Sequence, residues 1–275
     1  MAKRGFFGSP RAFSISSGKG GVGKTTLAAN LAYALSRKGQ RVLLFDGDLG
    51  LANVDVLLGL SARRHVGEVL TGHCSLKDVM LEAPGGFKVL PASSGIVSLT
   101  HLSEAQKLLL LEEFERLAQE FDYVLFDTSA GISENVLYFN LASQERILVS
   151  TPEPTALTDV YALIKVLYQR YNVKRFHLVV NSSRRFQQGE EIYRQLIRVV
   201  EHFLGSVSLN LLAVLPYDQR VSLSIRAQRS ILDLFPGSSF ARAIEDLAHE
   251  LMAIEKTPME GGLQFFSRKL MGVNA

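Results

Sequence analysis

Short apolar runs alternate with longer amphipathic segments along most of this 275-residue chain. Apolar runs with little polar alternation are typical of strands that helices cover on both faces of a parallel sheet. The expected strands are Ala12–Ser16, Arg41–Phe45, Phe87–Leu90, Tyr123–Phe126, Arg146–Ser150, Phe176–Val180 and Leu211–Leu215. The expected helices are Thr25–Lys38, Glu104–Glu120, Ser133–Ala142, Thr158–Tyr171, Glu190–Phe203 and Phe240–Ile254. This alternation predicts a doubly wound α/β fold, with a mostly parallel sheet and helices on both faces.

The chain shows no internal repeat, low-complexity linker or composition shift that would divide it into two large domains. We expect an N-terminal tail at residues 1–12 and one domain at residues 13–255. A C-terminal tail follows at residues 256–275, where Pro258, Gly261 and Gly262 interrupt the helical pattern.

Composition narrows the class of protein. The single cysteine, Cys74, excludes a disulfide framework and any multi-thiolate metal site within one chain. No apolar run is long enough for a signal peptide or a membrane span, and a lone thiol suits the reducing cytosol, so we expect a cytoplasmic protein. The net charge of +3 is too small to predict nucleic-acid binding by itself, and we expect no specific binding of nucleic acid.

The segment SSGKGGVGKTT lies between an expected strand and an expected helix. Its glycines, lysine and threonine fit the phosphate-loop pattern GxxxxGK[ST], in which backbone N–H groups and the helix dipole hold phosphate oxygens. Lys24 would then reach the β- and γ-phosphates, and the Thr25 hydroxyl would bind Mg²⁺. The expected nucleotide contacts in this loop are Gly18, Lys19, Gly20, Gly21, Val22, Gly23, Lys24, Thr25 and Thr26.

A second lysine, Lys19, precedes the usual one. The segment KGGVGKTT resembles the deviant Walker A motif of the MinD/ParA ATPases, in which this lysine reaches the nucleotide of a second subunit. The resemblance implies that ATP drives formation of a homodimer and that Lys19 and Lys24 are both catalytic. A cation supplied in trans would act as an arginine finger does. The alternative is an incidental surface lysine.

Carboxylates end two of the expected strands. Asp46 and Asp48 follow one strand, and Asp127 ends the strand of DYVLFDTSAG. Spacing alone leaves open whether Asp46 and Asp48 are metal-site residues or solvated turn residues. The resemblance implies that Asp46 and Asp127 join Thr25 at Mg²⁺, the two aspartates through water, and that Asp48 positions the attacking water. We expect Asp122 to be a solvated residue.

Two further segments resemble the family's base-binding elements. Asn181, at the end of FHLVVN, matches an asparagine that reads adenine, and an amide offers the donor and acceptor that adenine needs. Pro216, Tyr217 and Asp218 match the loop that closes over the base. A strand-end cap remains the alternative for Asn181.

Within the family, three segments are most similar to the flagellar-number regulators, the FlhG/FleN group: DGDLGLANVDVLLG, DTSAGISENVLYFNLAS and TPEPTALTDVYALIKVLY. The resemblance implies a slow ATPase that acts as a switch on flagellar number or placement, through the GTPase FlhF or a FleQ-like transcription activator. The sequence MAKRGFFGSPRAF lacks the DQA segment by which some relatives stimulate that GTPase. The branches of the family in which cysteines bridge the dimer are excluded for this chain. A MinD-like division-site role, a ParA-like DNA-partition role and a scaffold with a decayed site remain alternatives.

Two surfaces are candidates for contacts outside the nucleotide site. Helical spacing in GGLQFFSRKLM places four apolar residues on one face: Leu263, Phe266, Leu270 and Met271. Such a tail could bind an anionic membrane reversibly, could pack on its own domain, or could stay disordered. We expect partners to meet the helix at Thr158–Tyr171 and the segment Leu49–Asp55, where nucleotide-linked motion is expected.

Overall fold

The computed structural model describes residues 10–48, 53–64, 66–91 and 103–255. Its strands are β1 (Arg11–Ser17), β2 (Val42–Gly47), β3 (Leu81–Glu82), β4 (Lys88–Leu90), β5 (Tyr123–Ala130), β6 (Glu145–Ser150), β7 (Arg175–Ser183) and β8 (Ser208–Pro216). Its longer helices are α1 (Lys24–Arg37), α5 (Glu104–Ala118), α6 (Glu134–Ala142), α7 (Pro154–Tyr171), α8 (Phe186–Leu204), α9 (Gln219–Arg226) and α11 (Ser239–Ala253). The short helices are α2 (Val54–Leu57), α3 (Val66–Leu70), α4 (Leu76–Val79) and α10 (Ile231–Leu234).

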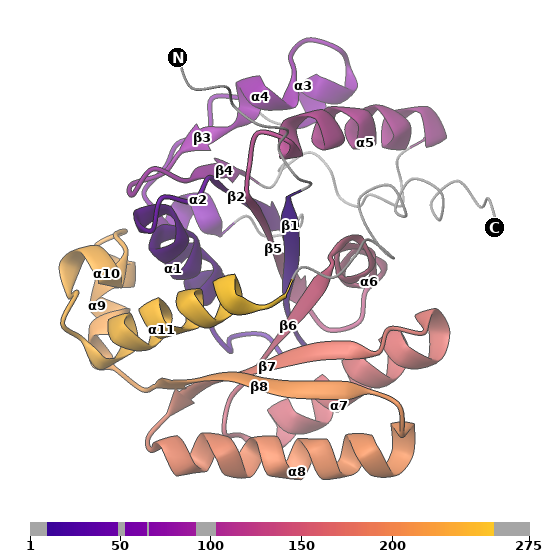
Figure 1. The fold of residues 1–275 in the computed structure, drawn as a ribbon. Helices are drawn as coiled ribbons and strands as arrows, with labels where there is room; N and C mark the ends of the chain where they lie inside the picture. Colours follow the sequence, from indigo (N-terminus) through magenta and orange to yellow (C-terminus); the bar gives the residue numbers. More distant parts are fainter. Residues whose placement is uncertain (1–9, 49–52, 65, 92–102, 256–275) are drawn as a thin grey trace.

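The strands form one sheet in the order β3-β4-β2-β5-β1-β6-β7-β8 (Figure 1). Six of the strand pairings are parallel, and only the edge strand β3 runs antiparallel to β4 among the described pairs. On one side of β1 the chain forms β2, β3 and β4 and then returns to place β5 between β1 and β2, whereas on the other side β6, β7 and β8 follow in sequence order. Strands on both sides of β1 give the doubly wound arrangement predicted from the sequence. In such sheets the ligand lies at the carboxyl ends of the strands, next to the point where the winding reverses.

Helices cover both faces of the sheet. On one face α1, α10 and α11 pack over side chains such as Ile15 and Leu125. On the other face α3–α5 pack over β2, β4 and β5, while α7 and α8 pack over β6–β8. Alternation along each strand produces this division: Leu125 faces α1, whereas its neighbours Val124 and Phe126 face α5 and α6. Figure 1 shows α1 and α11 crossing one side of the strands, with α7 and α8 beyond β7 and β8.

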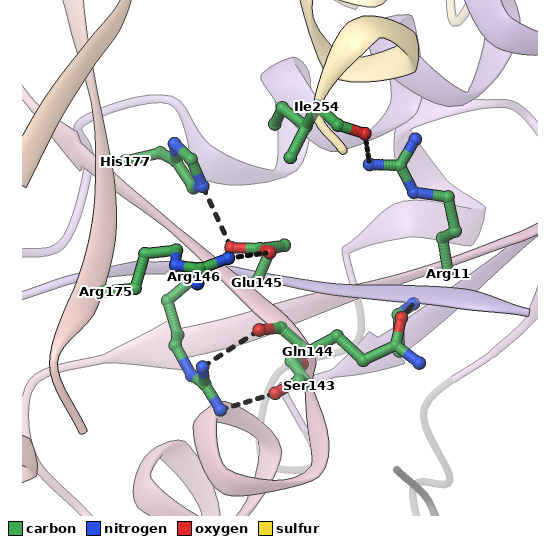
Figure 2. A network of polar contacts seen from close by, with 9 residues as sticks. Arg11, Ser143, Gln144, Glu145, Arg146, Arg175, His177 and Ile254 are labelled. Carbon is green, nitrogen blue, oxygen red and sulfur yellow. Dashed lines mark hydrogen bonds and ion pairs between the residues drawn. The ribbon is translucent and has the colours of Figure 1, made fainter. Parts of the chain in front are cut away.

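The amino ends of the strands carry a buried polar network far from the carboxyl edge (Figure 2). The Glu145 carboxylate, which is almost fully buried, lies 3.0 Å from His177 Nε2 and 3.2 Å from Arg175 Nη1. The Arg146 guanidinium donates to the backbone carbonyls of Asn140, Ser143 and Gln144. Burial lowers the pKa of Arg146 to about 10.

Arg11 holds the end of α11 at the same edge. Its guanidinium donates to the carbonyl oxygens of Met252 and Ile254, at 3.2 and 2.8 Å, and lies over the rings of Phe13 and Tyr123. A cation at the carboxyl end of a helix satisfies carbonyls that have no partner within the helix. The predicted tail at residues 256–275 lies outside the described residues.

One sequence prediction at this edge is correct only in part, since the Asp122 side chain is 37% exposed but is also paired. Asp122 is not simply solvated, because both of its oxygens bond Arg41: Oδ1 lies 2.6 Å from Nη2, and Oδ2 accepts from the Arg41 backbone N–H and Nε. The pair ties the residue before β5 to the residue before β2. No helix in the described part of the chain is both long enough and apolar enough to cross a membrane.

Candidate functional site

The phosphate-binding loop connects β1 directly to α1. β1 ends at Ser17, α1 begins at Lys24, and Gly23 caps the helix with φ of 93°. That left-handed conformation is costly for any residue with a side chain. The open N-terminus of α1 therefore presents backbone N–H groups and the positive end of the helix dipole to whatever the loop encloses.

Gly18 lets the loop approach α7 closely. A Cβ atom at this position would lie 2.2 Å from the carbonyl carbon of Asp159 and 2.4 Å from its Cβ, distances that real Cβ atoms do not adopt. Gly20 has the opposite environment, since a Cβ there would meet nothing within 4 Å. The loop thus rests on α7 at one glycine and is open at another.

Lys24 turns inward. Its Nζ donates to Ser17 Oγ at 2.8 Å, and Ser17 Oγ donates to the Lys19 carbonyl at 2.6 Å. Burial lowers the pKa of Lys24, while the charges of Asp127 and Asp48 act in the opposite direction. The structure therefore brings Lys24 together with two of the three predicted carboxylates.

Lys19 turns outward. Its Nζ lies 2.5 Å from Glu153 Oε2 and 3.3 Å from Thr155 Oγ1, at the start of α7. Both charged side chains are substantially exposed, at 40% for Lys19 and 59% for Glu153. The two lysines of the loop consequently have different environments, one enclosed beside carboxylates and the other on the surface.

Strand register places Asp46 and Asp127 side by side. Asp46 of β2 pairs with Asp127 of β5, and Asp127 pairs with Ile15 of β1 just before the loop. Both carboxylates are buried. Burial is the largest cause that raises the pKa of Asp46 to about 6 and of Asp127 to about 7. The charge of Asp48 adds to the rise in both pKa values, and the charge of Asp46 adds to the rise at Asp127.

The two aspartates have different hydrogen-bond partners. Asp46 Oδ1 accepts from the backbone N–H of Asp48, and its Oδ2 accepts from those of Asn53 and Val54. Asp46 thus holds both ends of the segment 49–52, which itself lies outside the described residues. Asp127 accepts a hydrogen bond from Thr25, but its Oδ1 is buried without any partner in the described structure.

These oxygens fit Mg²⁺. The donor set consists of hard oxygens, the Thr25 hydroxyl and the carboxylates of Asp127 and Asp46, and the unpartnered Asp127 Oδ1 can accept a metal-bound water. Within the described residues no group of three or more His, Cys, Asp or Glu side chains could hold a metal alone. This agrees with a site in which phosphate oxygens and water complete the coordination of Mg²⁺.

Of the predicted base-binding residues, Asn181 lies beside the loop. Asn181 Nδ2 donates to the Val22 carbonyl at 2.8 Å, and its Oδ1 accepts from Ser182 N, so each half of the amide keeps one bonding position. Tyr217 is exposed and its N–H bonds the Ser183 carbonyl. The Asp218 carboxylate is occupied by Arg220 and by the cap of α9, which lowers its pKa to about 2.

Sequence reasoning did not identify three residues at this edge. Glu153 and Thr155 bind Lys19, and their signal was present in the polar segment TPEPT directly after a buried strand. Thr151, the residue directly after β6, is buried, and its hydroxyl has no partner among the described residues. Of the predicted partner surface on α7, Lys165 and Arg170 are exposed, while Asp159 is half-buried beside Gly18.

Comparisons with known proteins find relatives along nearly the whole chain. A family model described as an AAA domain matches residues 10–179. The antiactivator FleN of Pseudomonas aeruginosa is 39% identical over 275 residues, covering 98% of this chain and 97% of FleN. The flagellum site-determining protein YlxH of Helicobacter pylori is 32% identical over 268 residues, covering 96% of this chain and 90% of YlxH.

Solved structures of related proteins share the fold. The cell-division ATPase MinD of Pyrococcus furiosus has a TM-score of 0.71 at 28% identity, covering 89% of this chain and 99% of that one. MinD of Pyrococcus horikoshii, solved with Mg-ADP, gives the same score and identity, covering 89% of this chain and 97% of that one. Together with the two lysines of the phosphate loop and the paired aspartates, these matches show that the chain belongs to the MinD/ParA family of ATPases. Within that family it is similar to FleN and YlxH.

Proposed function

We propose that this protein is an ATP-dependent switch that dimerises with ATP, hydrolyses it slowly and regulates the number or placement of flagella through partner proteins. The observation that carries the proposal is that the two lysines of the phosphate loop lie in different environments. Lys24 is enclosed with Asp127 and Asp48, whereas Lys19 lies on the surface. A lysine on the loop that does not turn into its own site is available to the nucleotide of a second copy.

The proposed chemistry follows from the positions of the charged groups. Lys24 and the N–H groups at the start of α1 would hold the β- and γ-phosphates. Mg²⁺, when bound near Thr25, Asp46 and Asp127, would neutralise charge on the same phosphates. Asp48 would orient the attacking water, and Lys19 from the second subunit would stabilise charge on the transferred group. Hydrolysis would thus depend on dimerisation.

The flagellar assignment rests on the relatives. YlxH is named for determining the flagellum site, and FleN is named an antiactivator; both align with nearly the whole chain. A MinD of Aquifex aeolicus has been solved in complex with MinC, so a structural relative binds a partner protein. For this chain the candidate partners are a flagellar GTPase of the FlhF type or a FleQ-like transcription activator.

We also propose a reversible attachment to the inner face of the cell membrane. The basis is the sequence of the C-terminal tail, whose apolar and basic residues would lie on opposite faces of a helix. A single short helix binds weakly, so an ATP dimer presenting two tails would bind more tightly.

We propose a separate role in binding the adenine base for four residues: Asn181, Pro216, Tyr217 and Asp218.

The test compares molecular mass with ATP, with ADP and without nucleotide, by light scattering with Mg²⁺ present. Wild type should be a dimer with ATP and a monomer with ADP, and Lys19→Ala should remain a monomer with ATP. Equal masses in ATP and ADP would overturn the switch. Protein held in its ATP-bound state should then retain flagellar proteins from a cell extract. Retention of division proteins would instead favour the MinD-like alternative, and salt-dependent retention on DNA would favour the ParA-like alternative.

A further inference from the structure

A buried polar network lies beneath the phosphate-binding loop, on the face of the sheet opposite α1. In β1 the hydroxyls of Ser14 and Ser16 alternate with the apolar side chains of Phe13 and Ile15, and all four residues have no exposed surface. The apolar pair faces α1, so the two serines face α6. Both serine hydroxyls contact one side chain of that helix, Asn140.

These contacts use both hydrogens of the Asn140 amide and one acceptor position of its oxygen. Its Nδ2 donates to Ser16 Oγ at 2.8 Å and to the Val136 carbonyl at 2.7 Å, and its Oδ1 accepts from Ser14 Oγ at 3.1 Å. Asn140 itself has no exposed surface. A buried amide that lost these partners would leave several polar groups unsatisfied, which is costly in a low-dielectric interior.

The network also reaches the strand that carries Asp127. Thr128, the next residue, donates from Oγ1 to Ser16 Oγ at 2.9 Å and lies 3.2 Å from the Ile15 carbonyl. Ser16 Oγ therefore connects α6 and β5 to the carboxyl end of β1. Three residues after Thr128, the Gly131 N–H donates to the Ser17 carbonyl at 2.9 Å.

We propose that Asn140 is a positioning residue for ATP hydrolysis, an inference that rests on the proposed function. Through Ser16, Asn140 fixes the position at which the phosphate loop leaves β1 relative to Asp127 and to α6. Ser16 immediately precedes Ser17, which accepts the Lys24 hydrogen bond, and Thr128 immediately follows Asp127. The hydrogen bonds through Ser16 thus set the spacing between the lysine and the carboxylate without contacting nucleotide.

Loss of the network should affect turnover more than binding. The loop's own N–H groups stay in place when its root shifts, so the phosphates are still held. The alignment of Lys24 with Asp127 is needed chiefly in the transition state, where small displacements are expensive. A mutation that removes an interaction made only in the transition state lowers kcat and leaves KM nearly unchanged.

The experiment measures ATP turnover, ATP KM and melting temperature for the full-length wild type, Asn140→Leu, Ser16→Ala and the double variant. Asn140→Leu keeps the size of the side chain and removes all of its hydrogen bonds. We expect a fall in kcat of about tenfold with KM within about twofold. Ser16→Ala should give a similar fall, and the double variant should be no slower than the slower single variant, because both mutations remove the same connection.

Ser143→Ala is the matched control. Ser143 is equally buried at the end of α6, but its hydroxyl bonds only the Phe139 carbonyl of the same helix and does not reach β1. It should lower the melting temperature while kcat stays within about twofold of wild type. If Asn140→Leu fails to fold, Ser16→Ala alone carries the test.

The outcomes separate this inference from the proposed function. A wild type that hydrolyses ATP, with Ser16→Ala and any folded Asn140→Leu keeping the same kcat, would overturn only the positioning role. Equal losses of kcat in Asn140→Leu and Ser143→Ala would overturn it too, by showing that any defect in α6 suffices. A wild type that binds no ATP would overturn the proposed function and the positioning role with it.

Discussion

Lys19 and Glu153 form an ion pair across the mouth of the phosphate loop, with 2.5 Å between Nζ and Oε2. In the proposed dimer the Lys19 side chain turns away from its own subunit and contacts the nucleotide bound by the second subunit. Because the Lys19 side chain cannot lie against Glu153 of its own subunit and reach the nucleotide of a second subunit at the same time, the ion pair within the monomer competes with dimerisation. An exposed pair contributes at most about 1 kcal/mol, so the competition is mild.

The first prediction tests this competition. Glu153→Gln removes the charge that holds Lys19 and keeps the size of the side chain. A symmetric dimer breaks one such pair in each subunit, so the variant should tighten the ATP-dependent dimer by up to about 25-fold, as measured by concentration-dependent light scattering or sedimentation. Glu250→Gln is the control, since Glu250 is exposed on α11 and forms no ion pair within the described structure. A weaker dimer in Glu153→Gln would show instead that Glu153 contacts the second subunit.

The second prediction separates binding from hydrolysis. Lys24→Ala should lose most of its affinity for ATP, because the buried ammonium beside Asp127 and Asp48 is the charge expected on the phosphates. Asp48→Ala should bind ATP and dimerise but turn over about a hundredfold more slowly, since it loses only the group that orients water. Equilibrium binding of a fluorescent ATP analogue and phosphate release measure the two effects. Equal ATP affinities in wild type and Lys24→Ala would contradict the phosphate-loop assignment.

The third prediction concerns pH. Burial raises the pKa of Asp127 to about 7 and of Asp46 to about 6, above the value of about 4 expected in the unfolded chain. Between those values the folded protein binds more protons than the unfolded one, so this contribution to stability is greatest below pH 4 and is lost as pH rises through 6 and 7. Asp218, whose pKa is lowered to about 2, acts only below this window.

Urea unfolding without nucleotide or Mg²⁺, at pH 5 and at pH 8, measures this effect. The free energy of unfolding should fall less between the two pH values in Asp127→Asn than in wild type, because the variant lacks the titrating carboxyl. All other ionisable groups are common to the two proteins, so the difference between them reports Asp127 and its effect on the charged groups beside it. Parallel pH profiles would show that Asp127 is ionised throughout the range.

The sequence predicted the main elements and the nucleotide edge of the fold. All seven expected strands and all six expected helices are present, with ends that differ by several residues in α7 and α8. The elements that it missed are short: β3 has two residues, and α2, α3, α4 and α10 have four or five. Such segments contain too few turns for an apolar period to show, and α9 has only eight residues.

Side-chain partners were harder to predict than strands. Lys19 and Glu153 lie 134 positions apart, and nothing local to either residue specifies their contact. Asp122 meets Arg41 for the same reason, through neighbouring strand starts. The Asn140 network did leave a local signal, because serines alternate with apolar residues in FSIS, a pattern that places polar groups on one face of a buried strand. Buried hydroxyls of this kind need partners, and the sequence does not say which.

The last prediction concerns the buried network at the opposite edge of the sheet, where Glu145 contacts His177 and Arg175 (Figure 2). Glu145→Ala should lower the free energy of unfolding by about 2–3 kcal/mol, because hydrogen bonds to a buried charged group are lost and their partners stay behind. Arg146 should be affected as well, since the charge of Glu145 offsets part of the burial that lowers its pKa. Urea denaturation measures the change.

Two comparisons decide whether this network is purely structural. Glu190→Ala, which breaks a surface pair with Arg194 at 3.4 Å, should cost only about 0.3–0.5 kcal/mol. ATP-dependent dimerisation of Glu145→Ala should match wild type at temperatures where both are folded, because Glu145 begins β6 and the phosphate loop lies at the carboxyl ends of the strands. A Glu145→Ala protein that is as stable as wild type would mean that His177 and Arg175 find other partners. A folded variant that no longer dimerised would instead connect the two edges of the sheet.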